Sequence, residues 1–329
     1  SANGLLKDLR RIKEQWDQTG STESFSLGVH DQGGKLIFPE KLYGRDRELA
    51  QLMQVFEEVT RGNTVLQMVG GYSGVGKTVL IHELQQPIAA QGGLLLEGKF
   101  GQYQRSIPFF AIKQALQELL EILRTQSSEE RRRFKEGLTK LLGKDVGALL
   151  DLMPDLEEIT GPLLLLQEVD AQDALVRLRQ AFKALLTVLT RDQPVVFFLD
   201  DMQWADTASM SLIKQVVLDQ DIQKVLCVGA YRDNEVSAGH GLQVMINEIG
   251  DLQGPIHQLT LDPLPATDVH QYIQDCFQWG EEESSNLSTI VFQKTRGNAF
   301  FVKEFIKNIH RLGLVEFDQK SGIWRAVSY

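Results

Sequence analysis

Gly71-Tyr72-Ser73-Gly74-Val75-Gly76-Lys77-Thr78 matches the phosphate-binding loop pattern G-x-x-x-x-G-K-[ST] without a mismatch. The apolar run at residues 65–69 before it predicts a buried parallel strand, and residues 78–84 after it predict a helix. In such a loop the glycines let the backbone wrap a phosphate, while N–H groups at the start of the helix point toward it. We therefore expect the backbone from Gly71 to Val79 to bind phosphates.

Two side chains of this loop have specific expected roles. Lys77 is expected to reach the β- and γ-phosphates of a nucleotide, and the hydroxyl of Thr78 is expected to bind Mg²⁺. A Gly-rich turn without a ligand is the simpler alternative, but the strand, the loop, the Lys-Thr pair and the helix all agree with a phosphate site.

A second half of this site is expected where residues 194–199 form an apolar run that ends in Asp200-Asp201. We expect a strand here that neighbours the strand before the loop, so that both acids emerge near the phosphates. P-loop NTPases hold Mg²⁺ with a carboxylate at such a position. Asp200 is assigned to the metal through water, and Asp201 to orienting or deprotonating the attacking water.

A third apolar run, residues 225–231, ends in one basic residue, Arg232. If this run is another strand of the same sheet, Arg232 emerges at the same edge as Asp200 and faces a γ-phosphate. The alternative is a surface arginine in the turn at 232–235, and the residues alone do not separate the two.

Length and charge limit the class of protein. The chain has 329 residues and a formal net charge of −10, which disfavours a general nucleic-acid binder. Its two cysteines, Cys227 and Cys276, fall in an apolar strand and an amphipathic helix, which indicates small core residues in a reducing compartment. No apolar run approaches membrane-spanning length, so we expect a cytoplasmic protein with no membrane partner.

The alternation of strands and helices predicts an α/β fold of the P-loop NTPase class, with a parallel sheet flanked by helices. Residues 1–38 are expected to form a linker segment, with a short helix where Leu5, Leu9 and Ile12 have helical spacing. Residues 39–262 are expected to form the core, with a helical insertion at about 101–192 that serves packing or a partner. Residues 263–329 are expected to form a smaller helical lid subdomain that ends in a β-hairpin.

The chain carries five motifs of interest, at residues 42–49, 71–78, 199–206, 229–235 and 295–301. Together they resemble the AAA+/STAND class of ATPases, and they cover nearly the whole chain in the order of that family. The Asp-Asp-x-Gln-Trp-Ala-Asp segment is the most specific. More narrowly, the chain resembles the ATPase module of large cyanobacterial-type signalling proteins, in which a Ser/Thr kinase domain precedes the module and sensor and histidine-kinase domains follow. Residues 1–9, 25–28 and 99–105 resemble that subgroup, which implies a fragment of a longer protein.

The resemblance implies further site residues. Tyr43, Gly44 and Arg45 would lie near the adenine, and Arg45 would also approach phosphate. Arg232 resembles the family's γ-phosphate sensor. Asn298 belongs to a lid motif that usually reads Gly-x-Pro, but Ala299 stands where the proline is expected, which puts the coupling of lid to nucleotide in doubt. Arg105 is a loose candidate for a trans-acting arginine finger in a homo-oligomer.

Together these features predict a Mg²⁺-dependent module that binds and hydrolyses ATP, releases ADP and acts as a switch on adjacent kinase and sensor domains of the same polypeptide. ATP is preferred over GTP because no Asn-Lys-x-Asp guanine motif occurs. Three alternatives stay open: a scaffold that holds nucleotide without hydrolysis, a DNA-remodelling initiator-type ATPase, and a small-molecule kinase. The acidic charge disfavours the second, and no acceptor pocket is recognisable for the third.

Overall fold

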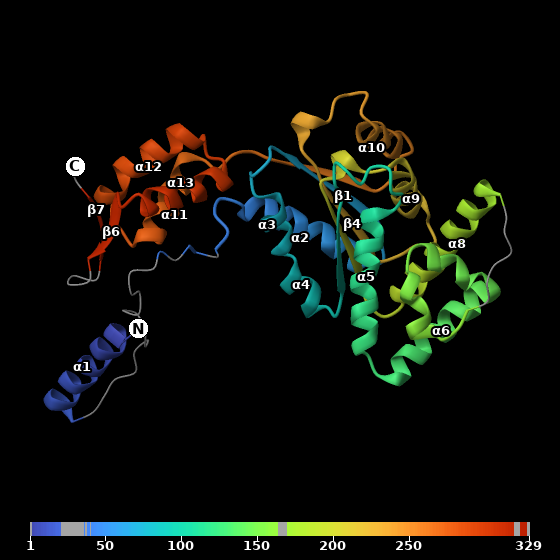
Figure 1. Cartoon of the computed structure of the whole chain (residues 1–329), viewed down its shortest axis with the longest axis horizontal. Helices are drawn as coiled ribbons and strands as arrows, with labels where there is room; N and C mark the ends of the chain where they lie inside the picture. Colours follow the sequence, from blue (N-terminus) through green and yellow to red (C-terminus); the bar gives the residue numbers. More distant parts are fainter. Residues whose placement is uncertain are drawn as a thin grey trace. The chain divides into compact units, whose positions relative to one another are not determined.

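The computed structural model describes residues 2–20, 36, 38–39, 41–163, 170–318 and 323–327. They divide into two compact units (Figure 1). One unit runs from Arg45 to Asp262, and we call it the nucleotide unit. The other contains the described residues up to Gly44 together with those from Pro263 onward, and we call it the C-terminal unit. The predicted junction motif at 25–28 lies outside the described residues.

The nucleotide unit is built around a parallel sheet that includes β1 and β4 (Figure 1). The sheet has five strands in the order β2-β3-β4-β1-β5. The predicted α/β class with a parallel sheet flanked by helices is confirmed. One expectation is wrong: the strand that ends at Asp200 does not neighbour the strand before the loop, because β4 lies between them. The strands are β1 (Val65–Gly71), β2 (Leu94–Lys99), β3 (Val195–Asp200), β4 (Val225–Ala230) and β5 (Ile256–Leu261).

The burial of the individual strands agrees with this strand order. Every residue of β1 and β4 is buried, as are the first five of β3, and these strands read as continuous apolar runs. Strands covered on both faces have this composition. The two edge strands are less buried and carry polar residues such as Glu97 and His257. An edge strand tolerates such residues because one side of it has no neighbouring strand.

Helices of the nucleotide unit both precede and follow the phosphate-binding loop in the sequence. The predicted helix after the loop is shorter than expected: α3 ends at His82, and α4 begins at Gln85 with Pro87 in its first turn, where a proline is tolerated. The helices outside the insertion are α2 (Asp46–Thr60), α3 (Lys77–His82), α4 (Gln85–Ala90), α9 (Thr207–Leu218) and α10 (Gly241–Asp251).

The segment between β2 and β3 is helical among its described residues. Helix α5 packs against β2, and its buried leucines belong to the same hydrophobic core as those of β3 and α8. Helix α6 begins at a capping box formed by Ser127 and Glu130. This shared core supports the packing role over a separate partner surface. The helices are α5 (Phe110–Thr125), α6 (Ser128–Leu142), α7 (Glu157–Thr160) and α8 (Ala171–Leu189), with 3-10 turns at Gly143–Asp151 and Pro154–Leu156.

The C-terminal unit has its own core, in which Phe277 and Trp324 are buried. Its predicted helices and its terminal β-hairpin are confirmed. Gly313 follows the last helix with φ +69, as a C-terminal cap requires. Among the described residues, no helix has the length and apolar character needed to cross a bilayer. The elements are α1 (Ala2–Thr19), α11 (Ala266–Phe277), α12 (Glu281–Thr295), α13 (Ala299–Arg311), β6 (Val315–Asp318) and β7 (Ile323–Ala326).

Candidate functional site

The phosphate-binding loop follows β1 and leads directly into α3. Gly71 has φ +147, and a Cβ there would lie 2.8 Å from the backbone oxygen of Leu261 in the neighbouring strand β5. Only glycine fits this position, because a side chain would meet both a strained backbone and an immovable carbonyl. Gly76 immediately precedes α3, so the N–H groups of the first helical turn open toward the loop.

Lys77 lies inside this loop. Its Nζ donates to the backbone oxygens of Gly71 at 2.6 Å and Tyr72 at 2.9 Å, and the residue is buried. Burial lowers the pKa of Lys77, although the nearby carboxylates of Asp200 and Asp201 act in the opposite direction. The loop therefore surrounds a desolvated ammonium group, which is the kind of group that binds a phosphate oxygen strongly.

Thr78 and Asp200 are brought together, as the sequence predicts, although their strands are not neighbours. The Thr78 hydroxyl lies 3.5 Å from Oδ2 of Asp200. A hydroxyl and a carboxylate are both oxygen ligands, and Mg²⁺ prefers oxygen ligands completed by water and phosphate. These two residues therefore fit the predicted metal.

Asp201 is the most constrained acid of the site. It is buried, with a left-handed backbone conformation (φ 55°, ψ 41°) that is uncommon outside glycine. Its carboxylate accepts from the amide of Gln203 at 2.9 Å and pairs with Lys99 at 2.9 Å and Arg232 at 3.4 Å. Burial acts to raise the pKa of Asp201, but these three donors outweigh it and hold that pKa below its usual value.

Arg232 lies at the same sheet edge as Asp200 and contacts Asp201 at 3.4 Å, while its contact with a γ-phosphate stays a prediction. Its Nη1 also pairs with Glu235 in the following turn at 2.8 Å. Its guanidinium lies over the ring of Trp204, with Cζ 4.8 Å from the ring centroid. This cation–π contact gives Trp204 a role in holding Arg232 beside Asp201.

Gln203 joins the two halves of the site and was not predicted as a site residue. It is almost completely buried. Its Nε2 donates to Asp201, and its Oε1 accepts the backbone N–H of Arg232 at 3.0 Å. One side chain therefore ties the end of β3 to the end of β4. The signal in the sequence was a glutamine two residues after an acidic pair, which on its own does not specify this contact.

Lys99 was likewise not predicted as a site residue. It ends β2 and pairs in register with Asp200 of β3. Its Nζ lies 3.0 Å from Oδ2 of Asp200 and 2.9 Å from Oδ2 of Asp201. Burial acts to lower the pKa of Lys99, but the two carboxylates outweigh it and raise that pKa. A basic residue at the end of a predicted strand was the available signal.

Arg45 makes its described contacts with groups of the protein, and its approach to adenine and phosphate stays a prediction. The residue is buried, and Nη2 donates to the backbone oxygens of Val75 at 3.3 Å and Asp262 at 2.5 Å, while Nη1 pairs with Glu48. Val75 belongs to the loop, and Asp262 is the last residue of the nucleotide unit. The guanidinium therefore connects both ends of this unit to the phosphate-binding loop.

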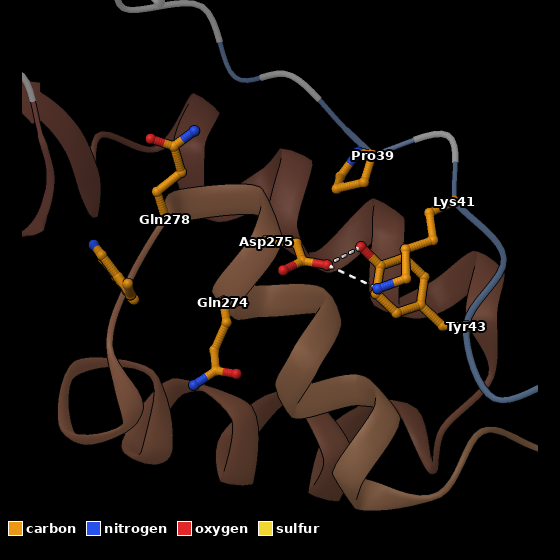
Figure 2. A pocket seen from close by; sticks show the side chains of 7 residues that line it. Pro39, Lys41, Tyr43, Gln274, Asp275 and Gln278 are labelled. Atoms are coloured by element: carbon orange, nitrogen blue, oxygen red, sulfur yellow. Dashed lines mark hydrogen bonds and ion pairs between the residues drawn. The ribbon is translucent and has the colours of Figure 1, made fainter. Parts of the chain in front are cut away.

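Tyr43, Gly44 and Asn298 belong to the C-terminal unit. Figure 2 shows the hydroxyl of Tyr43 and the ammonium of Lys41 reaching the carboxylate of Asp275, at 2.6 and 3.7 Å. The side chain of Asn298 caps α13 by accepting the backbone N–H of Phe301. Contacts within their own unit thus hold Tyr43 and Asn298, and the nucleotide contacts of all three residues stay predictions.

Two other residues of the family motifs have structural partners. Arg105 donates to the backbone oxygen of Gln203 at 2.7 Å within its own chain, and its role as a trans-acting finger stays a prediction. Asp206 caps α9 by accepting from Ser209 and also accepts the N–H of Phe109. Val79, in the first turn of α3, has an exposed side chain, and its contact with a nucleotide stays a prediction.

Both cysteines match their prediction as small core residues. Cys227 and Cys276 are free thiols and buried, and burial raises the pKa of each to about 12. Neither thiol takes part in the contacts of the candidate site that are described above.

Several known proteins are similar to this chain. The hybrid signal transduction histidine kinase G of Dictyostelium discoideum is 25% identical, over 98% of this chain and 12% of its own length. The peroxide stress-activated histidine kinase mak3 of Schizosaccharomyces pombe is 22% identical, over 44% of this chain and 6% of its own length. The chain thus spans only a small part of these curated relatives.

Two solved structures resemble the chain at low identity. Cdc6p from Pyrobaculum aerophilum gives a TM-score of 0.41 at 12% identity, covering 76% of this chain and 53% of that one. A variant of RuvB from Thermotoga maritima gives a TM-score of 0.40 at 14% identity, covering 84% and 66%. The family model described as AAA ATPase domain matches residues 41–228, more than half of the sequence. On this match, the chain belongs to the AAA ATPase domain family.

Proposed function

We propose that this chain is a Mg²⁺-dependent ATP-binding and ATP-hydrolysing switch within a multidomain signalling protein. One observation carries the proposal. The phosphate-binding loop, with Lys77 inside it, opens beside a convergent set of Thr78, Asp200, Asp201 and Arg232, which come from three different strand ends. A loop that binds phosphate without hydrolysis has no need for the second acid and the arginine at the same edge.

Each side chain has a role that follows from its position. Lys77 would bind the β- and γ-phosphate oxygens once its ammonium turns from the loop carbonyls to the nucleotide. Thr78 and Asp200 would hold Mg²⁺, Asp200 through water, and the bound ion would neutralise charge on the phosphates. Arg232 would stabilise the charge that develops on the γ-phosphate.

Asp201 is better suited to orient the attacking water than to remove its proton. Three donors surround its carboxylate and stabilise the ionised form. A carboxylate with a lowered pKa is a weak base, but it accepts hydrogen bonds well and can fix a water molecule in line with the γ-phosphate. Gln203 would keep Asp201 and Arg232 in fixed positions relative to each other during this step.

The switch role rests on the covalent context of the relatives. The Dictyostelium protein is a hybrid histidine kinase, and the part similar to this chain is 12% of its length. We propose that adjacent kinase and sensor domains of the same polypeptide are the partners of this module. Arg45 offers a route for coupling, because it connects the loop at Val75 to both ends of the nucleotide unit. A change at the phosphates would reach the connecting segments through these contacts.

Steady-state phosphate release from Mg²⁺-ATP tests the proposal. We expect the parent chain to turn over and Lys77→Ala to lose both ATP binding and turnover. Lys183→Ala is the matched control, because Lys183 pairs with Asp219 and Asp221 away from the site. ATP binding that is equal in Lys77→Ala and the parent would refute the proposed site. Tight binding without phosphate release would instead indicate a module that holds nucleotide as a scaffold.

A further inference from the structure

The ammonium group of Lys99 pairs with both acids of the site, Asp200 and Asp201. The Nζ of Lys99 contacts Oδ2 of Asp200 at 3.0 Å and Oδ2 of Asp201 at 2.9 Å. Oδ2 of Asp200 is also the atom that lies 3.5 Å from the Thr78 hydroxyl. A metal ion held by Thr78 and Asp200 would therefore compete with this ammonium group for the charge of the Asp200 carboxylate.

The backbone of Lys99 is fixed, whereas its side chain is not. The N–H of Lys99 donates to Gln114 of α5 at 2.8 Å, and the next residue, Phe100, donates to the backbone oxygen of Asp200 at 3.0 Å. The side chain is 61% exposed, while those of Asp200 and Asp201 are 14% and 9% exposed. Of the three side chains in these ion pairs, that of Lys99 is therefore the one with the most room to move.

A cavity gives this side chain somewhere to go. Its volume is about 420 Å³, and Lys99, Thr78 and Asp200 line it together with Glu97 and Glu118. Glu97 and Lys99 project to the same face of β2, since they are two residues apart. An ammonium group that leaves the acidic pair thus enters a space that already carries carboxylates. There the carboxylates of Glu97 and Glu118 would offset its positive charge in place of Asp200.

We propose that Lys99 is an internal counter-ion of the Asp200–Asp201 pair, which competes with Mg²⁺ for Asp200. This inference rests on the proposed function, because it assumes that Asp200 serves the metal. Two carboxylates on consecutive residues repel each other unless a cation lies between them. Lys99 supplies that cation and holds the two carboxylates close together. It thereby lowers the affinity of the nucleotide-free site for a divalent ion. Nucleotide phosphates then provide the additional ligands that make the exchange favourable.

Binding of Mn²⁺ to the nucleotide-free chain, followed by the electron paramagnetic resonance signal of the free ion, tests this exchange directly. We expect Lys99→Met to bind Mn²⁺ about tenfold more tightly than the parent, the size expected for losing two partly exposed ion pairs. Lys99→Arg keeps the cation and should behave like the parent. Lys183→Met removes a lysine that also bridges two aspartates, Asp219 and Asp221, and should leave Mn²⁺ binding unchanged.

The direction of the change separates this role from a structural one. Damage to the fold would weaken Mn²⁺ binding by Lys99→Met, whereas removal of a competing cation strengthens it. Equal, weaker or undetectable Mn²⁺ binding by Lys99→Met would overturn the proposal, and so would equal tightening in Lys183→Met. The proposed ATPase function fails by a different result, namely no loss of ATP binding in Lys77→Ala. The two failures are therefore distinguishable.

Discussion

Replacement of Gln203 by leucine should damage both the stability and the catalysis of the nucleotide unit. Gln203→Leu keeps the approximate volume of a side chain that is 1% exposed. It removes the hydrogen bond to the ionised Asp201, and it leaves the N–H of Arg232 without its acceptor. A bond to a charged group contributes about 1.5–3 kcal/mol, and an unsatisfied buried donor costs about 1–3 kcal/mol.

A destabilisation of about 3 kcal/mol follows from the lower part of these ranges. For a unit of roughly 150–250 residues, this lowers the melting temperature by about 6–12 °C. Calorimetric unfolding measures the shift. Gln243→Leu is the control, because Gln243 bonds only to exposed Asn247 among its described partners. This control should change stability by less than about 0.5 kcal/mol.

Turnover supplies the second readout for Gln203. Because Gln203 fixes Asp201 relative to Arg232, its loss should reduce the hydrolysis rate by about 10²-fold, while the loop still binds ATP. Gln203→Glu keeps an acceptor for Arg232 but places a carboxylate against Asp201, so it should also lose turnover. The reasoning is refuted if Gln203→Leu melts within about 2 °C of the parent and hydrolyses ATP at the parent rate.

Three further predictions concern the frame of the site and of the C-terminal unit. Arg45→Met should cost about 2–3 kcal/mol and weaken ATP binding, because the carbonyls of Val75 and Asp262 lose their donor, whereas exposed Arg61→Met should do neither in the same titrations. Gly297→Ala should cost more than about 2 kcal/mol in thermal unfolding, since φ is +76 and a Cβ would lie 2.0 Å from the Leu264 carbonyl oxygen. Gly313→Ala, with a similar φ but only the flexible Glu316 side chain nearby, should cost about 1 kcal/mol, and equal losses would contradict this explanation. Glu118→Gln should stabilise the chain at pH 7, because burial and the nearby Glu97 carboxylate raise the pKa of Glu118 and outweigh the hydrogen bond from the Glu97 N–H, which lowers it. The stability linked to a raised carboxyl pKa is present below the unfolded-state pKa and is lost as pH rises through the folded-state pKa. The advantage of the glutamine in urea unfolding should therefore disappear as the pH falls toward 4, and a gap that widens on acidification would refute it.

The local part of the site could be predicted from the sequence. The strand, loop and helix around Gly71 and Lys77 follow from a continuous motif whose residue spacing fixes the backbone path. The pairing of Thr78 with Asp200 was also predicted, although the assumed strand adjacency was wrong. Strand order depends on which buried faces pack together over long sequence separations, and an apolar run carries little information about its neighbour.

Lys99 and Gln203 show why the rest could not be predicted. Lys99 reaches the acids only because β2 pairs with β3 in a register that sets it opposite Asp200. Gln203 matters because β3 and β4 are adjacent, which lets one buried amide span Asp201 and Arg232. Both contacts depend on non-local pairing, so the polar residue types alone did not identify them.

Arg45 and Asn298 show the opposite limit. Their resemblance to family motifs predicts ligand contacts, which stay predictions, and the structure adds that their side chains bond to backbone groups of the protein. Buried or capping polar groups need such partners, and a motif does not reveal whether the partner is a ligand or the chain itself.

Separate measurement of binding and hydrolysis in Asp201→Asn tests the central claim most directly. Asparagine keeps the size of Asp201 but removes the charge that would orient water beside Arg232. Our account predicts ATP affinity within about threefold of the parent and single-turnover hydrolysis at least about 10²-fold slower. Hydrolysis by Asp201→Asn at the parent rate would show that this carboxylate takes no part in the reaction, and the account would be wrong.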